Sequence, residues 1–384
     1  LRRDPRQAFA YNLLAAVAWR ERDYPLALVL YRIAASLEDK DESYALDYFR
    51  AALWVRQGEQ VLAWLLDRVT RFGAKSHQPA VTYFRACDLL NRAHHGLEVL
   101  ESSLRLRPDD GELLLFMANA YAGNGDLARA AQLLEAARER VSNVRWLIES
   151  ASFAARGHDL QAALRLWEQV LEATPHNSHA VQQKAALLAK LKGPRTALEY
   201  VGALIDATPN WLDLYQVWME WADHADPKTQ EALLRRLLSL HPSNAWAQRQ
   251  LAQVLIQLGD AAGAAAIAQD AVRADPNNPR AYETLGDIER RSDHREHAQQ
   301  AYRRAIELSA DSSYSIEKLV ATGANSEERR TLLRFIKNEL LRQITHGEGV
   351  AGYYSSARAV LDPVALGAEL EEAWRARPDL WQTW

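Results

Sequence analysis

Apolar residues recur three and four positions apart along most of the chain, which is the spacing of one buried stripe on an α-helix. Within residues 111–137 there are two such stripes, the first formed by Leu114, Met117, Ala118 and Tyr121, the second by Ala130, Leu134 and Ala137. A short break that often contains glycine separates them, and glycine tolerates the left-handed conformation that ends a helix. The pattern predicts an all-α chain built from pairs of short helices.

The helix pair repeats at an interval of about 34 residues, a period typical of stacked repeat arrays. Residues 245–271 align with residues 279–305, and the aligned pairs include Leu251 with Leu285, Ala252 with Gly286 and Ala268 with Tyr302. Four prolines follow one another at the same interval, namely Pro175, Pro209, Pro242 and Pro276. Proline lacks an N–H and cannot continue a helix interior, so it marks a recurring break. On this phase, repeats begin near Ala8, Tyr44, His77, Gly111, Val144, Ser178, Leu212, Ala245, Pro279, Ser313 and Gly347.

These features resemble the tetratricopeptide repeat (TPR), a helix-turn-helix unit of about 34 residues with small residues where its helices cross and proline in its closing turn. The resemblance is strongest over residues 8–37, 111–137, 144–175 and 245–310, and weakest over 44–108, 212–242 and 313–378. It implies a right-handed α-α superhelix, or solenoid, of about eleven units, whose first helices line a concave wall. We expect residues 1–312 to form about nine units of this superhelix, and residues 313–384 to continue the stack as degenerate, truncated helical units.

Composition and charge exclude several other classes of protein. The 384 residues carry a net charge of −4, so no global field favours nucleic acid or an anionic membrane. The single cysteine excludes an internal disulfide framework and a cysteine-rich zinc site. No run approaches the roughly 18 apolar residues of a membrane span. Because both ends look truncated, we expect a fragment of a longer, bacterial chain; a cytoplasmic location is favoured, with a periplasmic one if a missing N-terminus carries a signal or anchor.

Residues of the types that act in catalysis or bind metals do not form a catalytic set in this sequence. Cys87 precedes His94 and His95, but it lies in the apolar phase of a helix, where a free cysteine behaves as a small hydrophobe. His294 and His297 are three residues apart and share a helix face, yet a closed zinc site needs about four ligands. Phosphate loops, nucleophile elbows and His-Glu-x-x-His motifs are missing from the sequence. We therefore expect no enzyme activity in these residues, no metal and no cofactor.

Two sets of polar residues predict a partner-binding groove. The first set is a basic column near the ends of the first helices, comprising Arg20, Arg56, Arg156, Lys190, His224 and Arg291. It suits an acidic or carboxylate-bearing ligand through charge-assisted hydrogen bonds, although the helix macrodipole alone also favours cations there. The second set lines the expected inner wall and comprises Asn12, Tyr48, Arg85, Asn119, Gln182, Gln216, Arg249 and Gln253. In the resembled family, chaperone-binding members grip a C-terminal carboxylate with a fixed Lys, Asn and Arg set; Arg249 with Gln253 does not complete it, so that ligand is not predicted.

The resemblance implies a protein–protein interaction scaffold that binds an extended peptide or a partner domain, without nucleic acid. Two alternatives stay open. In the first, the chain is the TPR arm of a larger enzyme or of an exopolysaccharide synthesis or export protein, whose catalytic or membrane domain lies outside it. In the second, the chain is a helical-repeat RNA binder, which requires a basic groove that reads single bases.

Overall fold

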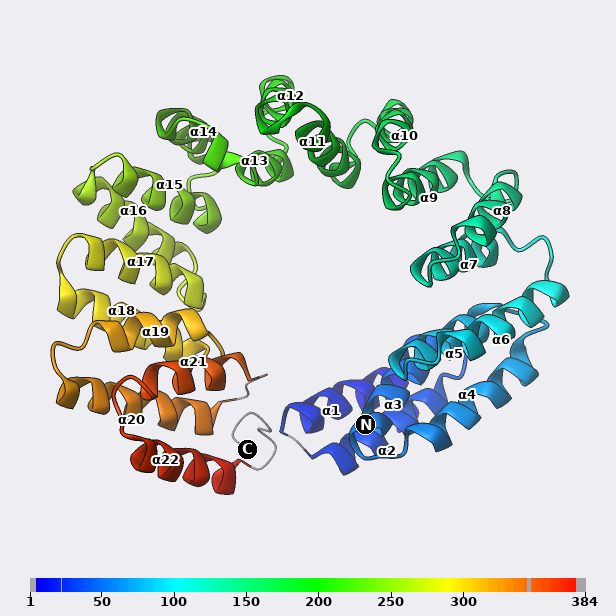
Figure 1. Cartoon of the computed structure of the whole chain (residues 1–384), viewed down its shortest axis with the longest axis horizontal. Helices are drawn as coiled ribbons and strands as arrows, with labels where there is room; N and C mark the ends of the chain where they lie inside the picture. The colour runs from blue at the N-terminus through cyan, green and yellow to red at the C-terminus, as the bar shows by residue number, and fades with distance from the viewer. Residues whose placement is uncertain (1–4, 22, 344–346, 378–384) are drawn as a thin grey trace. The chain divides into compact units, whose positions relative to one another are not determined.

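The computed structural model describes residues 5–21, 23–343 and 347–377, so the outer ends of the two expected domains, residues 1–4 and 378–384, lie outside the described residues. Within the described residues the chain consists of α-helices and one 3-10 turn, and it divides into two compact units, residues 1–191 and 192–384. Each unit is a run of helical hairpins, which Figure 1 labels along the chain. The predicted all-α fold of paired helices is confirmed.

In the first unit, the first helix of each hairpin is α1 (Ala8–Arg20), α3 (Glu42–Trp54), α5 (Gln78–Leu89), α7 (Gly111–Gly123), α9 (Asn143–Arg156) or α11 (Ser178–Lys192). The second helices of this unit are α2 (Tyr24–Leu37), α4 (Gly58–Phe72), α6 (Ala93–Leu106), α8 (Leu127–Ala137) and α10 (Leu160–Ala173).

In the second unit the first helices are α13 (Leu212–Met219), α15 (Ala245–Gln257), α17 (Pro279–Arg291), α19 (Ser313–Ala321) and α21 (Glu348–Ala357). The second helices are α12 (Pro194–Ala207), α14 (Pro227–Leu240), α16 (Ala261–Ala274), α18 (Arg295–Leu308), α20 (Ser326–Arg342) and α22 (Pro363–Ala376). Every repeat start expected from the sequence lies within two residues of the start of a first helix.

Aspartate and asparagine caps explain where many helices begin. Asp126, Asp159 and Asp260 each accept a hydrogen bond from the backbone N–H three residues later, at the starts of α8, α10 and α16. Asn244 does the same for α15. Such caps satisfy backbone donors that have no partner inside the helix, and each contributes about 1 kcal/mol. The helix starts are therefore encoded locally.

The turns inside the hairpins share one backbone feature. Arg56, Asn91, Gly125, His158, Gly259 and Asp293 all have positive φ, between 57° and 88°. They follow one another at the repeat interval or at three times that interval. This left-handed residue reverses the chain between the first and second helix of a hairpin.

Alanines, larger apolar residues and neighbouring hairpins form the core. Ala118, Ala130 and Ala137 are buried where α7 and α8 cross, and the cluster around them extends from Phe84 of α5 to the partly buried Trp146 of α9. Because one hairpin cannot cover its own apolar face, each is stabilised by the next.

One first helix is shorter than expected. α13 ends at Met219, and a 3-10 turn (η1, Ala222–His224) follows before Pro227 starts α14. The buried Gln230 amide donates hydrogen bonds to the carbonyls of Ala222 and Ala225, at 2.8 and 3.2 Å. This side chain holds the turn, so His224 lies in a 3-10 turn and not at the end of an α-helix.

Candidate functional site

The side chains of three successive first helices form a hollow of about 260 Å³ in the second unit, here named the Arg249 pocket. Its lining comprises Trp246, Arg249, Gln250 and Gln253 of α15, Arg280, Glu283, Thr284 and Asp287 of α17, and Tyr314 of α19. In Figure 1, α17 lies between α15 and α19. The lining residues of α15 are three or four positions apart, the spacing that places side chains on one helix face.

Arg249 gives the pocket its chemistry. Its side chain is half-buried, and among the described residues neither Arg249 nor Arg280 uses its guanidinium in a hydrogen bond or ion pair. Burial lowers the pKa of Arg249, and the nearby Arg280 cation lowers it further, while Asp275 and Glu283 act in the opposite direction. A guanidinium presents five N–H donors in a planar fork that matches a carboxylate or two carbonyl oxygens. The pocket therefore offers a desolvated cation with unused donors.

The opposite side of the pocket is acidic and held in place by hydroxyl groups. The Tyr302 hydroxyl donates to Asp287 Oδ1 at 2.7 Å, and the Tyr314 hydroxyl donates to Asp287 Oδ2 at 2.7 Å. Burial, together with the Asp287 carboxylate, raises the pKa of Tyr314, so its hydroxyl stays a donor at neutral pH. Ser315 Oγ donates to Glu283 Oε1 at 2.5 Å in the same way. These carboxylates are fixed, and each keeps acceptor sites for the N–H groups of a ligand.

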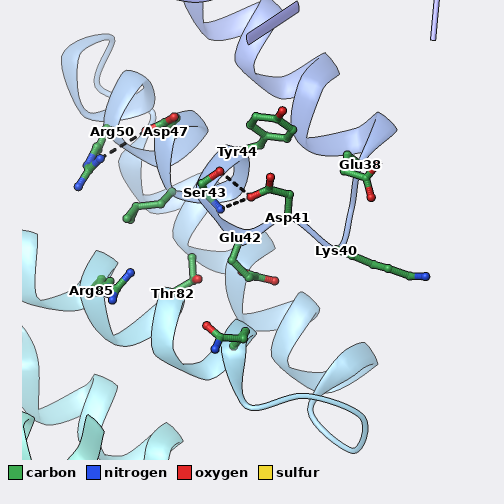
Figure 2. Close-up of a pocket in the computed structure, with 12 residues that line it drawn as sticks. Glu38, Lys40, Asp41, Glu42, Ser43, Tyr44, Asp47, Arg50, Thr82 and Arg85 are labelled. Carbon is green, nitrogen blue, oxygen red and sulfur yellow. Dashed lines mark hydrogen bonds and ion pairs between the residues drawn. The ribbon is translucent and has the colours of Figure 1, made fainter. Parts of the chain in front are cut away.

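A second hollow, of about 890 Å³, lies between α3 and α5 in the first unit (Figure 2). Thr82 and Arg85 of α5 lie across from Ser43 and Asp47 of α3. Its charged groups are largely satisfied by their neighbours: Asp41 accepts from Ser43, and Asp47 pairs with Arg50 at 3.3 Å. Burial raises the pKa of Asp47. Lys40 and Arg85 also line this hollow, but both are exposed, unlike the half-buried Arg249, and Arg85 lies 5.7 Å from the centre of the Phe116 ring.

The remaining residues expected on the inner wall lie in different settings. Tyr48 packs against Trp64, with ring centroids 5.4 Å apart, and lines a hollow with α2, away from the α3–α5 hollow. Asn12 Oδ1 is buried without a hydrogen bond among the described residues. Gln182 is half-buried on α11, and Gln216 is exposed on α13. Arg249 and Gln253, by contrast, line one pocket together.

Asn119 belongs to a network between α7 and α9. Its Nδ2 donates to Glu149 Oε2 at 2.5 Å, and its Oδ1 accepts from Arg156 Nη2 at 2.6 Å. Arg145 pairs with the same Glu149 at 2.9 Å. Two predicted groove residues, Asn119 and Arg156, are therefore in contact with each other.

The residues of the expected basic column do not all occupy the same position of the repeat. Its members Arg20, Arg56, Arg156, Lys190, His224 and Arg291 are all exposed. Arg56, however, occupies the left-handed turn position shared with His158 and Asp293, two residues beyond the phase of Arg156 and Arg291. Trp54 is the α3 residue at the phase of Arg20. His224 lies in the 3-10 turn. The shared repeat position near the end of a first helix is therefore occupied by four of the six residues, Arg20, Arg156, Lys190 and Arg291.

Sequence reasoning predicted two lining residues of the Arg249 pocket, Arg249 and Gln253, and did not predict the other seven as groove residues. Arg280, Glu283, Thr284 and Asp287 each follow a pocket residue of α15 by one repeat period, and Tyr314 follows Arg280 by the same step. Extending the repeat phase from Arg249 and Gln253 to α17 would have found Glu283 and Asp287.

The environment of Cys87 makes it a poor nucleophile. The side chain is buried, and burial raises the pKa of the thiol, although a hydrogen bond with Tyr83 acts in the opposite direction. The thiolate is the reactive form, so a raised pKa lowers reactivity. His94 and His95 are exposed on α6.

Each helix of residues 5–21, 23–343 and 347–377 is too short or too polar to cross a membrane.

Comparisons with known proteins agree with the repeat assignment. Models of the tetratricopeptide repeat match residues 91–147, 226–288 and 279–312. These matched segments are therefore tetratricopeptide repeats, and all but one of the residues lining the Arg249 pocket lie in them. No curated protein sequence matches the chain.

Several solved structures are similar to parts or all of the chain. MamA is 19% identical, with a TM-score of 0.35, over 43% of this chain and 91% of MamA. A thermophilic TPR protein of Thermus thermophilus is 20% identical, with a TM-score of 0.37, over 47% of this chain and 98% of that protein. Yeast Tom70 is 14% identical, with a TM-score of 0.41, over 98% of this chain and 88% of Tom70.

Proposed function

We propose that this protein is an interaction scaffold that holds an extended, acidic segment of a partner protein, and that the Arg249 pocket is its principal contact. Arrays of tetratricopeptide repeats are in general protein-interaction scaffolds. The assignment of the Arg249 pocket as the binding site is supported by the half-buried Arg249 guanidinium, which has unused donors and a second cation, Arg280, beside it.

The chemistry of the pocket fits a peptide chain. A carboxylate of the ligand accepts two hydrogen bonds from Arg249, which also relieves the repulsion between Arg249 and Arg280. Gln250 and Gln253 each donate and accept, so they pair with backbone amides of the ligand. Trp246 supplies an aromatic surface beside them, and aromatic anchors are frequent hot spots of interfaces. Asp287, fixed by two tyrosine hydroxyls, accepts from a ligand N–H.

The expected contribution of Arg249 to the free energy of binding follows from its hydrogen bonds, because a hydrogen bond to a charged group contributes about 1.5–3 kcal/mol. Replacing Arg249 by glutamine is expected to weaken binding about ten- to a hundredfold. Because the ligand is acidic, binding also weakens as salt concentration rises.

The test uses the full chain and a displayed library of random peptides. Enriched peptides are synthesised, and their affinities for the wild type, Arg249→Gln and Arg280→Gln are measured by calorimetry. Arg291→Gln is the matched control, since Arg291 is exposed at the end of α17 and does not line the pocket. We expect Asp- and Glu-rich peptides whose affinity depends on Arg249 and Arg280 but not on Arg291. Enrichment of basic or neutral peptides, or equal binding by Arg249→Gln, would contradict the proposal.

A further inference from the structure

Three potential metal ligands meet at the turn between α17 and α18. Glu289, in the last turn of α17, has a side chain only 8% exposed, whereas His294 and His297 are 60% and 67% exposed. Glu289 Oε2 lies 2.8 Å from His294 Nδ1 and 3.7 Å from His297 Nδ1. In the described parts of the chain, this is the one group of three or more His, Cys, Asp or Glu side chains whose ligand atoms all lie within 4.8 Å of one another.

The backbone of the turn creates this arrangement. Asp293 has a φ of 62°, which reverses the chain, and the His294 backbone N–H donates to the Glu289 carbonyl at 2.9 Å. His297 follows three residues after His294, so both rings lie on the same face at the start of α18. The sequence shows the two histidines but conceals the third ligand, because Glu289 belongs to the preceding helix.

We propose that Glu289, His294 and His297 bind a transition-metal dication, for which Zn²⁺ is the best match. Zinc takes imidazole nitrogens and carboxylate oxygens at about 2.0–2.2 Å in a tetrahedron, which places neighbouring ligand atoms about 3.4 Å apart. The observed separations of 2.8 and 3.7 Å fall on either side of that value. Mg²⁺ and Ca²⁺ select sites made of oxygen ligands, so two imidazoles disfavour them.

Metal binding replaces the hydrogen bond between His294 and Glu289. In the metal-free turn, His294 Nδ1–H donates to Glu289 Oε2. The metal takes the place of the Nδ1 proton, and the ring carries its one proton on Nε2 instead, so both imidazoles bind in their neutral form. Water occupies the fourth position of the tetrahedron.

The charges around the site have both signs, because Arg290 and Arg291 follow Glu289 in the last turn of α17. The nearest basic residue of α18, Arg295, is already paired with Glu328 of α20 at 2.9 Å. Asp293 and Glu296 flank the histidines along the chain. Glu289 lies at the C-terminal end of α17, where the helix dipole favours positive charge. Because the three ligands come from two helices, bound zinc cross-links the α17–α18 hairpin independently of any ligand in the Arg249 pocket.

The test is a calorimetric titration of the untagged full chain with ZnCl₂, and with MgCl₂ as the comparison metal. The variants are His297→Gln and Glu289→Gln, with native helicity checked by circular dichroism. The matched control is His94→Gln/His95→Gln, which removes two exposed histidines on α6 whose ring centroids are 4.0 Å apart.

We expect one equivalent of Zn²⁺ to bind the wild type and the control with affinities that agree within about twofold. We expect Zn²⁺ to bind His297→Gln at least about tenfold more weakly than the wild type. Zinc should also raise the melting temperature of the wild type but not that of His297→Gln. The proposal is overturned if the wild type shows no saturable zinc binding, if His297→Gln binds zinc as tightly as the wild type, or if the control loses binding instead.

Discussion

Gly286 of α17 lies directly against the ring of Tyr302 of α18: a Cβ added at Gly286 would be 2.7 Å from the ring atom Cε1. The ring is fully buried and its hydroxyl is held by Asp287, so it cannot move aside. At the equivalent positions of the preceding repeat, the residues are Ala252 and Ala268, both fully buried. The chain thus fills the same helix crossing in two ways, with glycine opposite tyrosine or alanine opposite alanine.

Gly286→Ala is expected to destabilise the α17–α18 hairpin by up to about 2 kcal/mol. Overpacking a filled core costs about 1–3 kcal/mol, which exceeds the roughly 1 kcal/mol that alanine gains over glycine in a helix. Amide hydrogen exchange of α17 and α18 measures the local effect in a repeat array. In a double-mutant cycle, Gly286→Ala should cost less when Tyr302→Ala is also present; additive effects would contradict the proposed contact.

The buried Arg68 of α4 depends on Glu42 of α3. Arg68 Nη2 contacts Glu42 Oε1 at 2.5 Å and the Asp39 carbonyl at 2.7 Å, with the Arg68 side chain only 2% exposed. Removing one partner of a buried ion pair costs about 3–5 kcal/mol, because the other charge is left uncompensated. We expect that loss for Glu42→Ala in urea unfolding. Asp47→Ala is the matched control: Asp47 pairs with the exposed Arg50, so its loss should cost at most about 1 kcal/mol.

Arg56 occupies a backbone conformation that suits glycine. Its φ is 59°, and an L-residue other than glycine pays roughly 1–2 kcal/mol there. Part of this strain is offset because glycine also makes the unfolded chain more flexible. Arg56→Gly is therefore expected to raise stability by about 0.5–1 kcal/mol, measured by chemical unfolding. The reciprocal change Gly125→Ala, at the same turn position with a φ of 88°, should lower stability; equal stabilities of all three proteins would argue against strain at this turn.

Tyr83 makes stability dependent on pH in the alkaline range. Burial raises the pKa of Tyr83 to about 12, and Cys87 contributes to the shift. Tyrosine in an unfolded chain has a pKa of about 10, so between these values the folded state holds a proton that the unfolded state has lost. Stability is complete below about pH 10 and falls as the pH rises toward 12.

The comparison of wild type with Tyr83→Phe isolates this contribution, because burial also raises the pKa values of Tyr302, Tyr314 and Tyr353. Urea unfolding of both proteins at several pH values above 9 is the measurement. The wild type should lose stability more steeply than the variant as the pH rises, and parallel curves would exclude Tyr83 as a cause.

Much of the fold follows from local information. The apolar stripes, the Asp and Asn caps and the turn prolines act over three or four residues, so their periodicity predicts the start of every first helix to within two residues. Where the sequence reasoning failed, a longer-range contact decided the outcome. Gln230 of α14 holds the turn that ends α13 early, and that contact crosses eight residues. The register of Arg56 was misjudged because helix-end and turn positions look alike in an arginine-rich sequence.

The sequence by itself determined that this protein is a series of paired helices with a fixed period, since helix formation and capping depend on neighbours along the chain. Only the tertiary structure decided which polar side chains meet. Arg249, Arg280 and Tyr314 converge because three first helices stack, and Glu289 reaches His294 and His297 because the turn at Asp293 reverses the chain. Both arrangements depend on the direction of side chains across separate helices, which no spacing within one helix specifies.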